Sequence, residues 1–192
     1  MRNDVEYPMF SNFEIGGVLA EQCANLYCRI WKEPPWCEDF WIPDQVEKTL
    51  RQELLRPDAG CVLALIEYIT GCRAEPPDPI CTIGFTWGYS VDRQELAEIA
   101  GGNQLDFITE STPRVFYIDE LGVDPDNRLK GVGRKLTTKL IIHAQKCGHR
   151  RIALRTDLRA IPARVLYRHL GFTELDVKDS RHENRTYWLL DL

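Results

Sequence analysis

A strand, a glycine loop and a helix follow one another between residues 115 and 156, and this order constrains the fold more than any other feature. The run Val115–Val123 (V-F-Y-I-D-E-L-G-V) is rich in strand-forming residues and ends at D-P-D. A helical pattern extends over Leu129–Cys147 and stops at Gly148, and Arg151–Thr156 then has the pattern of another strand. Because two strands joined through a helix pack as a right-handed parallel unit, the sequence predicts a mixed α/β sheet.

The segment R-L-K-G-V-G-R-K-L (128–136) joins the first of these strands to the helix. Gly131 and Gly133 let the backbone turn tightly and approach a ligand. The first amides of the following helix have no partner within the helix, and the helix dipole adds positive potential at that end. The basic side chains beside the glycines are Lys130, Arg134 and Lys135. Together these features predict a cradle for a phosphate group.

The charge distribution narrows the ligand classes. The chain has 192 residues, with 24 Lys and Arg against 29 Asp and Glu, so its formal net charge is −5. Residues 128–155 hold nine Lys or Arg and no acid. A nucleic-acid-binding domain is normally basic as a whole, whereas this chain is acidic outside that one stretch. The composition therefore favours a pocket for a small polyanion, or a solvated helix face, over a nucleic-acid surface.

Other segments with regular patterns complete the expected sheet. Helices are expected at Leu19–Trp31, over about a dozen residues from Pro43, and at Ile161–Leu170, and strands at Cys61–Tyr68, Ile80–Tyr89 and Thr186–Leu192. The strands at 61–68 and 80–89 are expected to pair as a hairpin across a turn at residues 71–79. The second helix is expected to turn four apolar residues inward, Val46, Leu50, Leu54 and Leu55. No repeat or linker interrupts the chain, so one domain is expected over residues 1–192.

The same sequence argues against membrane and metal-binding classes. Apolar runs such as Cys61–Ile66 are far shorter than the roughly 18–20 residues that a membrane-spanning helix needs. The start M-R-N-D-V-E-Y carries acids early and leads to no apolar signal segment. The seven Cys lack C-x-x-C spacing and several lie in apolar runs. This pattern predicts reduced, buried thiols in a cytoplasmic protein, and no zinc site.

Two motifs carry a resemblance to a known family. The glycine loop lacks the G-x-x-x-x-G-K-[ST] pattern of ATP-binding loops, and Leu136 stands where a dinucleotide fingerprint has its third glycine. R-x-x-G-x-G after a strand ending V-D-P instead resembles the coenzyme A loop of the GNAT superfamily of N-acetyltransferases. L-Y-R-H-L-G-F (Leu166–Phe172) resembles the later L-Y-x-x-x-G-F motif of that family. The resemblance implies the GNAT fold, in which N-terminal helices and an antiparallel hairpin precede β-α-β-α-β, with a cofactor-binding core at about 115–172.

The resemblance also implies that acetyl-CoA is the cosubstrate, without a metal, and it assigns residues to its binding. The Leu121 amide is implied to polarise the thioester carbonyl, and Val123 to form strand-like hydrogen bonds with the pantetheine arm. The loop residues implied to hold the pyrophosphate are Arg128, Leu129, Lys130, Gly131, Val132, Gly133, Arg134 and Lys135. The family often has an Asn that hydrogen-bonds to the cofactor arm where this chain has Ala160, so that contact is missing here.

Acetyl transfer to an alkyl amine needs a base or a proton relay, because such an amine has a pKa near 10.4. In a regular strand Tyr117, Asp119 and Leu121 share one face, and Glu120 points to the other. Members of the family splay this strand from its parallel neighbour and place the base on it. Asp119 and Tyr117 are therefore expected to face the acceptor, and Glu120 joins them if a bulge re-aims it. Alternatively, either acid pairs with Arg114 or caps a helix.

The remaining candidates are aromatic. The resemblance implies that Tyr167 protonates the departing thiolate, and the alternative is a core tyrosine under the last strand. Trp36, within W-K-E-P-P-W-C-E-D-F-W, and Trp87 are candidates for binding the acceptor. The acids near Trp36 that could add negative charge are Glu33, Glu38 and Asp39. The alternative for this segment is aromatic packing of a loop onto the sheet.

These features predict an N-acetyltransferase that moves an acetyl group from acetyl-CoA to a primary amine by direct attack in a ternary complex. Two acids near the thioester favour an acceptor that is a small cationic molecule. Two other functions stay open: acetylation of protein or peptide amines, and a non-catalytic acyl-CoA sensor of the same fold. A monomer or homodimer is expected, with no nucleic-acid or membrane partner.

Overall fold

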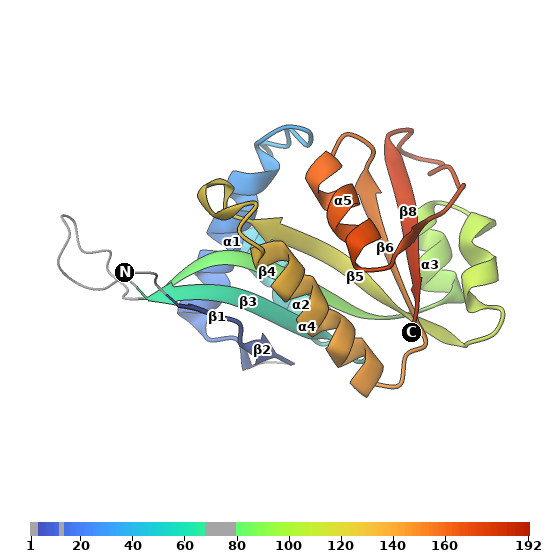
Figure 1. Cartoon of the computed structure of the whole chain (residues 1–192), viewed down its shortest axis with the longest axis horizontal. Coiled ribbons are helices and arrows are strands. Elements are labelled where there is room, and N and C mark those ends of the chain that lie inside the picture. The colour runs from blue at the N-terminus through green and yellow to red at the C-terminus, as the bar shows by residue number, and fades with distance from the viewer. Residues whose placement is uncertain (1–3, 12–13, 68–79) are drawn as a thin grey trace.

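The computed structural model describes residues 4–11, 14–67 and 80–192. A mixed sheet runs through the molecule with the strand order β1-β3-β4-β5-β6-β8-β7, and β2 also pairs with β3 (Figure 1). The strands are β1 (Val5–Glu6), β2 (Met9–Phe10), β3 (Gly60–Glu67), β4 (Ile80–Asp92), β5 (Arg114–Val123), β6 (Arg151–Asp157), β7 (Thr173–Glu174) and β8 (Arg185–Asp191). The helices are α1 (Gly17–Trp31), α2 (Pro43–Glu53), α3 (Arg93–Ala100), α4 (Val132–Lys146) and α5 (Ile161–His169), with the 3-10 turns η2 (Asn103–Thr109) and η3 (Pro125–Asn127).

The pair β5–β6 is parallel, as the sequence predicts, while the other pairs between described strands are antiparallel. β5 and β6 are paired only from Phe116 opposite Ile152 to Ile118 opposite Leu154. Beyond that point β5 continues beside β4 and β6 continues beside β8, so the two parallel strands diverge toward their carboxyl ends (Figure 1). In open α/β sheets ligands bind outside the carboxyl ends of parallel strands.

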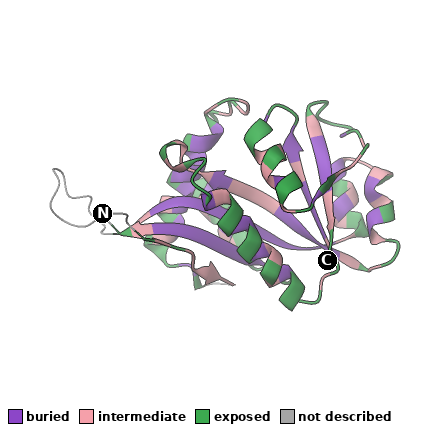
Figure 2. Ribbon diagram, viewed as in Figure 1, coloured by how far each residue is buried: buried purple, intermediate pink, exposed green. Residues whose placement is uncertain are grey.

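Helices cover both faces of the sheet (Figure 2). On one face α1 and α2 bury a core that includes Leu26, Leu50 and Tyr117. On the other face α4 and α5 cover a core built around Leu136 and Trp188. The two sides of β5 are therefore buried in different layers, and a side chain on β5 faces one layer or the other according to its place in the register.

Helix ends differ from expectation where the backbone or the local pattern intervenes. α4 begins at Val132 rather than Leu129, because Leu129 (φ +60°) and Gly131 (φ +84°) hold left-handed conformations that no α-helix contains. The prediction that Leu55 faces inward is wrong, since α2 ends at Glu53 and the Leu55 side chain is 53% exposed. The hairpin of β3 and β4 is confirmed, whereas its predicted turn at 71–79 lies outside the described residues.

The cysteine prediction holds in part. Cys23, Cys28 and Cys61 are buried, but Cys37 and Cys147 are exposed. Among the residues that the structure describes, no group of three His, Cys, Asp or Glu side chains could hold a metal ion. Within the same residues, no helix is both long and apolar enough to cross a membrane.

Candidate active site

A β-bulge on β5 sets the geometry of the site. Trp87 of β4 lies opposite Glu120, and the next residue, Gly88, lies opposite Ile118. Asp119 is therefore the extra residue, and such a residue shifts the side-chain alternation that follows it. Glu120 accordingly joins Asp119 on the α1/α2 face, as the sequence allowed for the case of a bulge.

The bulge also corrects one prediction for β5. Leu121 does not share a face with Tyr117, because after the bulge it packs in the core under α4 and α5. Tyr117 itself is 2% exposed and lies in the core under α1 and α2. The alternative that the β5 acids pair with Arg114 is wrong for the side chains seen here, since Arg114 bonds to Glu95 and to Ser90 instead.

Three carboxyl groups meet beside the bulge, each with a ring donor. The Tyr89 hydroxyl donates to Asp119 Oδ2 at 2.9 Å, and the Tyr27 hydroxyl donates to Glu120 Oε1 at 3.1 Å. Glu53, the last residue of α2, accepts from Trp87 Nε1 at 2.7 Å and shares a hydrogen bond with Asp119. We call Glu53, Asp119 and Glu120 the acid cluster.

The acid cluster holds protons more tightly than exposed carboxyls do. Burial, with the charge of Asp119 next, raises the pKa of Glu53 to about 8. Burial raises the pKa of Asp119, and burial together with the charges of Asp119 and Glu53 raises the pKa of Glu120 well above its ordinary value. Three carboxylates at this spacing repel one another, so the cluster keeps at least one proton near neutral pH. A group of this kind can take a proton from an amine.

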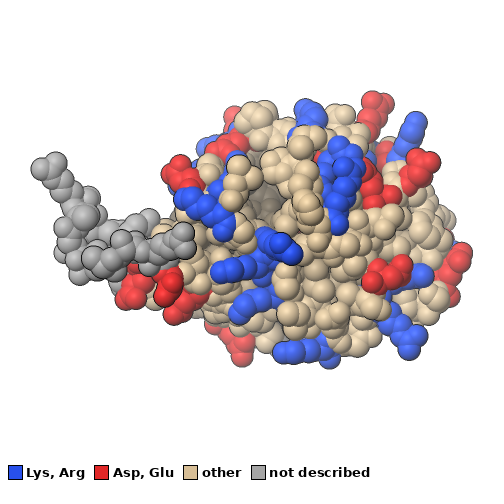
Figure 3. All heavy atoms as spheres, viewed as in Figure 1, with Lys and Arg blue, Asp and Glu red and all other residues tan. Residues whose placement is uncertain are grey.

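The loop before α4 lies at the end of the same strand. The first backbone hydrogen bond of α4 runs from the Lys135 amide to the Gly131 carbonyl. It leaves the preceding amides, those of Val132, Gly133 and Arg134, outside the helical hydrogen-bond pattern. Three N–H groups therefore remain free of helical partners at the positive end of the α4 dipole. Figure 3 shows the surface hollowed between this loop and α5, with Lys and Arg side chains on either side.

The charged side chains of the loop divide into two groups. Arg128 pairs with Glu33 at 2.9 Å and donates to the Val123 carbonyl, so it braces the loop rather than facing outward alone. Lys130 donates to the Asp126 carbonyl at 2.6 Å. Two further cations, Arg134 and Lys135, are exposed on the first turn of α4.

Tyr167 of α5 packs in the core layer on the opposite side of the sheet from the acid cluster. Its ring is 5% exposed and lies 5.8 Å from the Phe172 ring and 6.0 Å from the Trp188 ring. The structure gives its hydroxyl no hydrogen-bond partner among the described residues. Burial, with the charge of Glu120 next, raises the pKa of Tyr167. Tyr167 is thus both packed in the core and close enough to Glu120 to respond to its charge.

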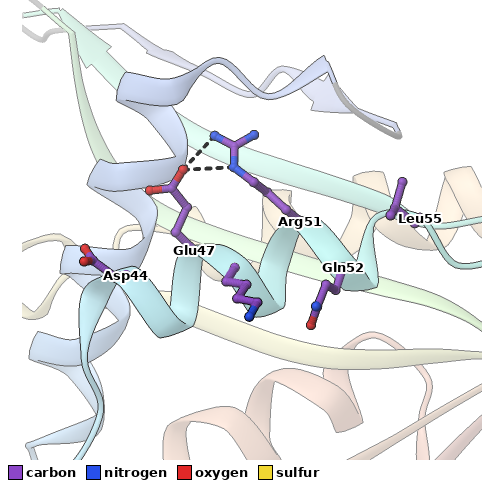
Figure 4. A pocket seen from close by; sticks show the side chains of 6 residues that line it. Asp44, Glu47, Arg51, Gln52 and Leu55 are labelled. Atoms are coloured by element: carbon purple, nitrogen blue, oxygen red, sulfur yellow. Dashed lines mark hydrogen bonds and ion pairs between the residues drawn. The ribbon is translucent and has the colours of Figure 1, made fainter.

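The two tryptophan candidates differ. Trp87 is 2% exposed, and its N–H holds Glu53, so it supports the acid cluster from within. Trp36 is half-buried, stacks on Trp31 at 5.9 Å and lines a hollow of about 190 Å³. A larger hollow, about 330 Å³, lies along α2 and the residues just after it (Figure 4). Its Glu47 and Arg51 are paired to each other, and none of its lining residues belongs to the acid cluster.

Sequence reasoning missed the partners that come from other elements. Glu53 ends a helix far along the chain from β5, and Tyr27 and Tyr89 lie on α1 and β4. Each of the two tyrosines follows the local period of its own element, so the pattern alone marks it only as a core residue. Their meeting depends on how α1 and α2 cross the sheet, which no local signal encodes.

The fold agrees with comparison to known proteins. The model of the acetyltransferase (GNAT) family matches residues 24–172. The chain belongs to this family. The predicted GNAT fold is confirmed as well, since an acetyltransferase of that family from Staphylococcus aureus superposes with a TM-score of 0.64 at 15% identity, covering 97% of this chain and 99% of the other.

Other similar proteins carry more specific names. A solved Arabidopsis thaliana NAA60 in complex with acetyl-CoA has a TM-score of 0.66 at 13% identity, covering 98% of this chain and 99% of that one. An agmatine N-acetyltransferase has a TM-score of 0.64 at 16% identity, covering 99% of this chain and 100% of the other. A curated relative, the mycothiol acetyltransferase of Pseudarthrobacter chlorophenolicus, is 36% identical over 89 residues, which are 43% of this chain and 28% of that protein.

Proposed function

We propose that this protein transfers an acetyl group from acetyl-CoA to the primary amine of a small molecule whose reacting nitrogen enters as a cation. The observation that carries the proposal is the placement of two unlike sites at the divergence of β5 and β6. A cradle of free amides lies at the N-terminus of α4, and the acid cluster lies under α1 and α2 on the other face of the sheet. Two substrates can therefore approach one point from opposite layers, as direct transfer in a ternary complex requires.

The chain's own residues fit the cosubstrate's charged end. The amides of Val132, Gly133 and Arg134 would bind the pyrophosphate, with the α4 dipole behind them. A Cβ at Gly133 would meet nothing closer than Leu166 at 3.4 Å, so the backbone there has room beside it. Leu121 and Val123 would hydrogen-bond the arm that follows, and Arg128, braced by Glu33, would hold the loop in shape. The remaining loop residues that we propose for pyrophosphate binding are Leu129, Lys130, Gly131 and Lys135.

Acetyl-CoA supplies the thioester, and the protein moves the protons. The acceptor's ammonium group loses one proton to Glu120, which passes it to solvent, and the neutral nitrogen then forms a bond with the acetyl carbon while the carbon–sulfur bond breaks. Tyr167 gives a proton to the leaving sulfur, the nitrogen of the new amide loses its second proton to solvent, and solvent returns a proton to Tyr167. A carboxylate whose pKa is raised is a stronger base for this step than an ordinary one. Asp119 and Tyr117 would orient the amine beside Glu120.

Support for a small acceptor comes from two directions. Carboxyl groups near the thioester attract an ammonium ion, and the hollow beside Trp36, about 190 Å³, has the size of a small molecule. Solved proteins of the same fold include an agmatine N-acetyltransferase and an aminoglycoside N-acetyltransferase. The names of those proteins describe them alone, and they make a small amine the first class to test.

The test is product mass in a panel of primary amines incubated with acetyl-CoA. The expected result is a gain of one acetyl group on at least one amine in wild-type protein, and a strong loss of that product with Glu120→Gln. Glu98→Gln, an exposed carboxyl on α3, is the matched control and should keep full activity. Acetyl-CoA binding without acetylation of any amine would contradict the proposal and favour a sensor of the same fold.

A further inference from the structure

The hollow beside Trp36 opens between segments that are distant in sequence. It lies among the loop after α1, the carboxyl end of β6 and the segment that leads into β8. Its lining residues are Trp36, Glu38, Asp157, Arg159, His182, Glu183, Asn184 and Arg185. Its walls carry both positive and negative side chains. The charge of a ligand that it can bind therefore depends on which of these side chains already have partners within the protein.

Most of the half-buried charges in the hollow are satisfied within the protein. Asp157 accepts from Arg159 Nε and Nη2, both at 2.9 Å, and Arg159 also donates to the Pro35 carbonyl at 3.0 Å. Glu38 accepts from Trp41 Nε1 at 2.7 Å. Hydrogen bonds from Arg159, together with its charge, lower the pKa of Asp157 and keep it ionised. None of these groups calls for a ligand.

Arg185 is different. Its side chain is only 21% exposed, yet its guanidinium makes no hydrogen bond to any described residue, and its ion-pair partner Glu38 lies 3.7 Å away. The guanidinium lies over the Trp36 ring at 4.8 Å. A guanidinium carries five N–H donors. Those of Arg185 still reach solvent, because Arg185 is not among the described side chains with a buried polar atom that lacks a partner. The free donors of Arg185 are therefore available to an oxygen-bearing ligand in the hollow.

A wall of rings joins Arg185 to the acid cluster. Tyr27, which donates to Glu120, stacks on Trp31 at 4.2 Å, and Trp31 stacks on Trp36. Burial and the neighbouring acids raise the pKa of Glu120, and the positive charge of Arg185 offsets part of that rise. Glu120 does not line the hollow and lies beyond this wall of rings, with a carboxyl base on one side of the wall and an unbonded guanidinium on the other.

We propose that the acceptor is an amino acid or a related amino carboxylic acid, whose carboxylate pairs with Arg185 while its amine reaches Glu120. This inference rests on the proposed function and narrows it: the small acceptor with a cationic amine also carries an anionic carboxylate. A carboxylate matches the planar fork of a guanidinium with two parallel hydrogen bonds. The ring of Trp36 supports the guanidinium from its face.

The experiment compares matched acceptors that differ only in the carboxylate. The pairs are histidine and histamine, phenylalanine and phenethylamine, lysine and cadaverine, and 4-aminobutanoate and propylamine, with phenylalaninamide as a third arm. For the pair that the enzyme acetylates, kcat/KM should favour the carboxylate member by about 10- to 100-fold, the range expected for a charged hydrogen-bonding pair. Arg185→Gln should reduce that ratio toward one, and Arg185→Lys should keep part of it.

Arg181→Gln is the matched control, because Arg181 is exposed in the same segment and does not line the hollow. It should leave the ratio unchanged. Equal or better acetylation of the carboxylate-free members by wild-type protein would overturn the inference and leave the proposed function standing. So would an unchanged ratio in Arg185→Gln, since Arg185 would then support only the fold. An equal kcat/KM for phenylalaninamide and phenylalanine would overturn the need for a carboxylate, because a peptide-like carbonyl would then serve as well. Acetylation of no amine would overturn the proposed function and this inference with it.

Discussion

The two sides of the diverging strands are built in different ways. On the α4/α5 side, the cradle comes from consecutive residues, Gly131 to Lys135, and its free amides follow from the start of a helix. On the α1/α2 side, the acid cluster takes Glu53 from a helix and two acids from a bulged strand, with donors from α1 and β4. The first site is local and tolerates change in the rest of the fold, whereas the second exists only when the layers pack as observed.

This contrast predicts separable functions. Changes in the acid cluster should reduce turnover and leave cosubstrate binding intact, and changes near the cradle should do the reverse. The largest effect is expected for Glu120→Gln. Because the amide cannot take a proton, kcat should fall by about 10²- to 10⁴-fold, while the melting-temperature shift with acetyl-CoA stays as in wild type. Steady-state kinetics measure turnover, and thermal melts measure acetyl-CoA binding. A kcat within threefold of wild type would contradict the role of Glu120 as the base.

Tyr167→Phe tests the Tyr167 hydroxyl, the group that we propose protonates the leaving sulfur. Its ring packing is preserved, so the fold should be stable, but the proton for the leaving sulfur is lost. We expect kcat to fall by roughly 10- to 100-fold with little change in acetyl-CoA binding. Turnover equal to wild type would assign Tyr167 to the core alone.

Glu53→Gln tests the acid cluster through the pH dependence of the free energy of unfolding. Because burial and Asp119 raise the pKa of Glu53 from an ordinary value near 4.5 to about 8, the folded state binds a proton that the unfolded state releases. The free energy of unfolding of wild-type protein should therefore decline as pH rises from about 5 to 8. The Gln variant should decline by less, with a difference of more than ~1 kcal/mol across that window. Denaturant titrations at several pH values measure it, and parallel pH profiles would contradict the shared proton.

Ala160→Asn should produce the smallest effect, and on the cradle side. Ala160 is the N-cap of α5 and makes no side-chain cap, so Asn would satisfy a free amide. The expected gain is about 1 kcal/mol, or a rise in melting temperature of about 2–4 °C. The KM for acetyl-CoA should fall a few-fold if the side-chain amide of the new Asn also reaches the pantetheine arm of acetyl-CoA. A stabilised variant with unchanged KM would limit the substitution to helix capping.

The same contrast explains what the sequence could predict. The parallel unit, the hairpin and the loop were predictable because each depends on local periodicity, β-formers or glycines. The bulge was foreseen only as a condition for Glu120, since nothing in Y-I-D-E-L fixes where the register shifts. Glu53, Tyr27 and Arg185 were not predictable as site residues, because their roles follow from tertiary contacts between elements far apart in the chain. Leu129 was expected to begin a helix, and its positive φ became visible only in the folded loop.

If the two sites are separate, the cradle binds acetyl-CoA independently of the acid cluster. The most direct measurement is the melting temperature of wild-type protein and of Glu120→Gln with increasing acetyl-CoA, using ATP and NADH as controls. A ligand that binds only the folded state at a hundredfold excess over its Kd stabilises it by about 2.7 kcal/mol. We predict the same selective rise for both proteins. No rise with acetyl-CoA in folded wild-type protein, or an equal rise with ATP or NADH, would contradict the claim.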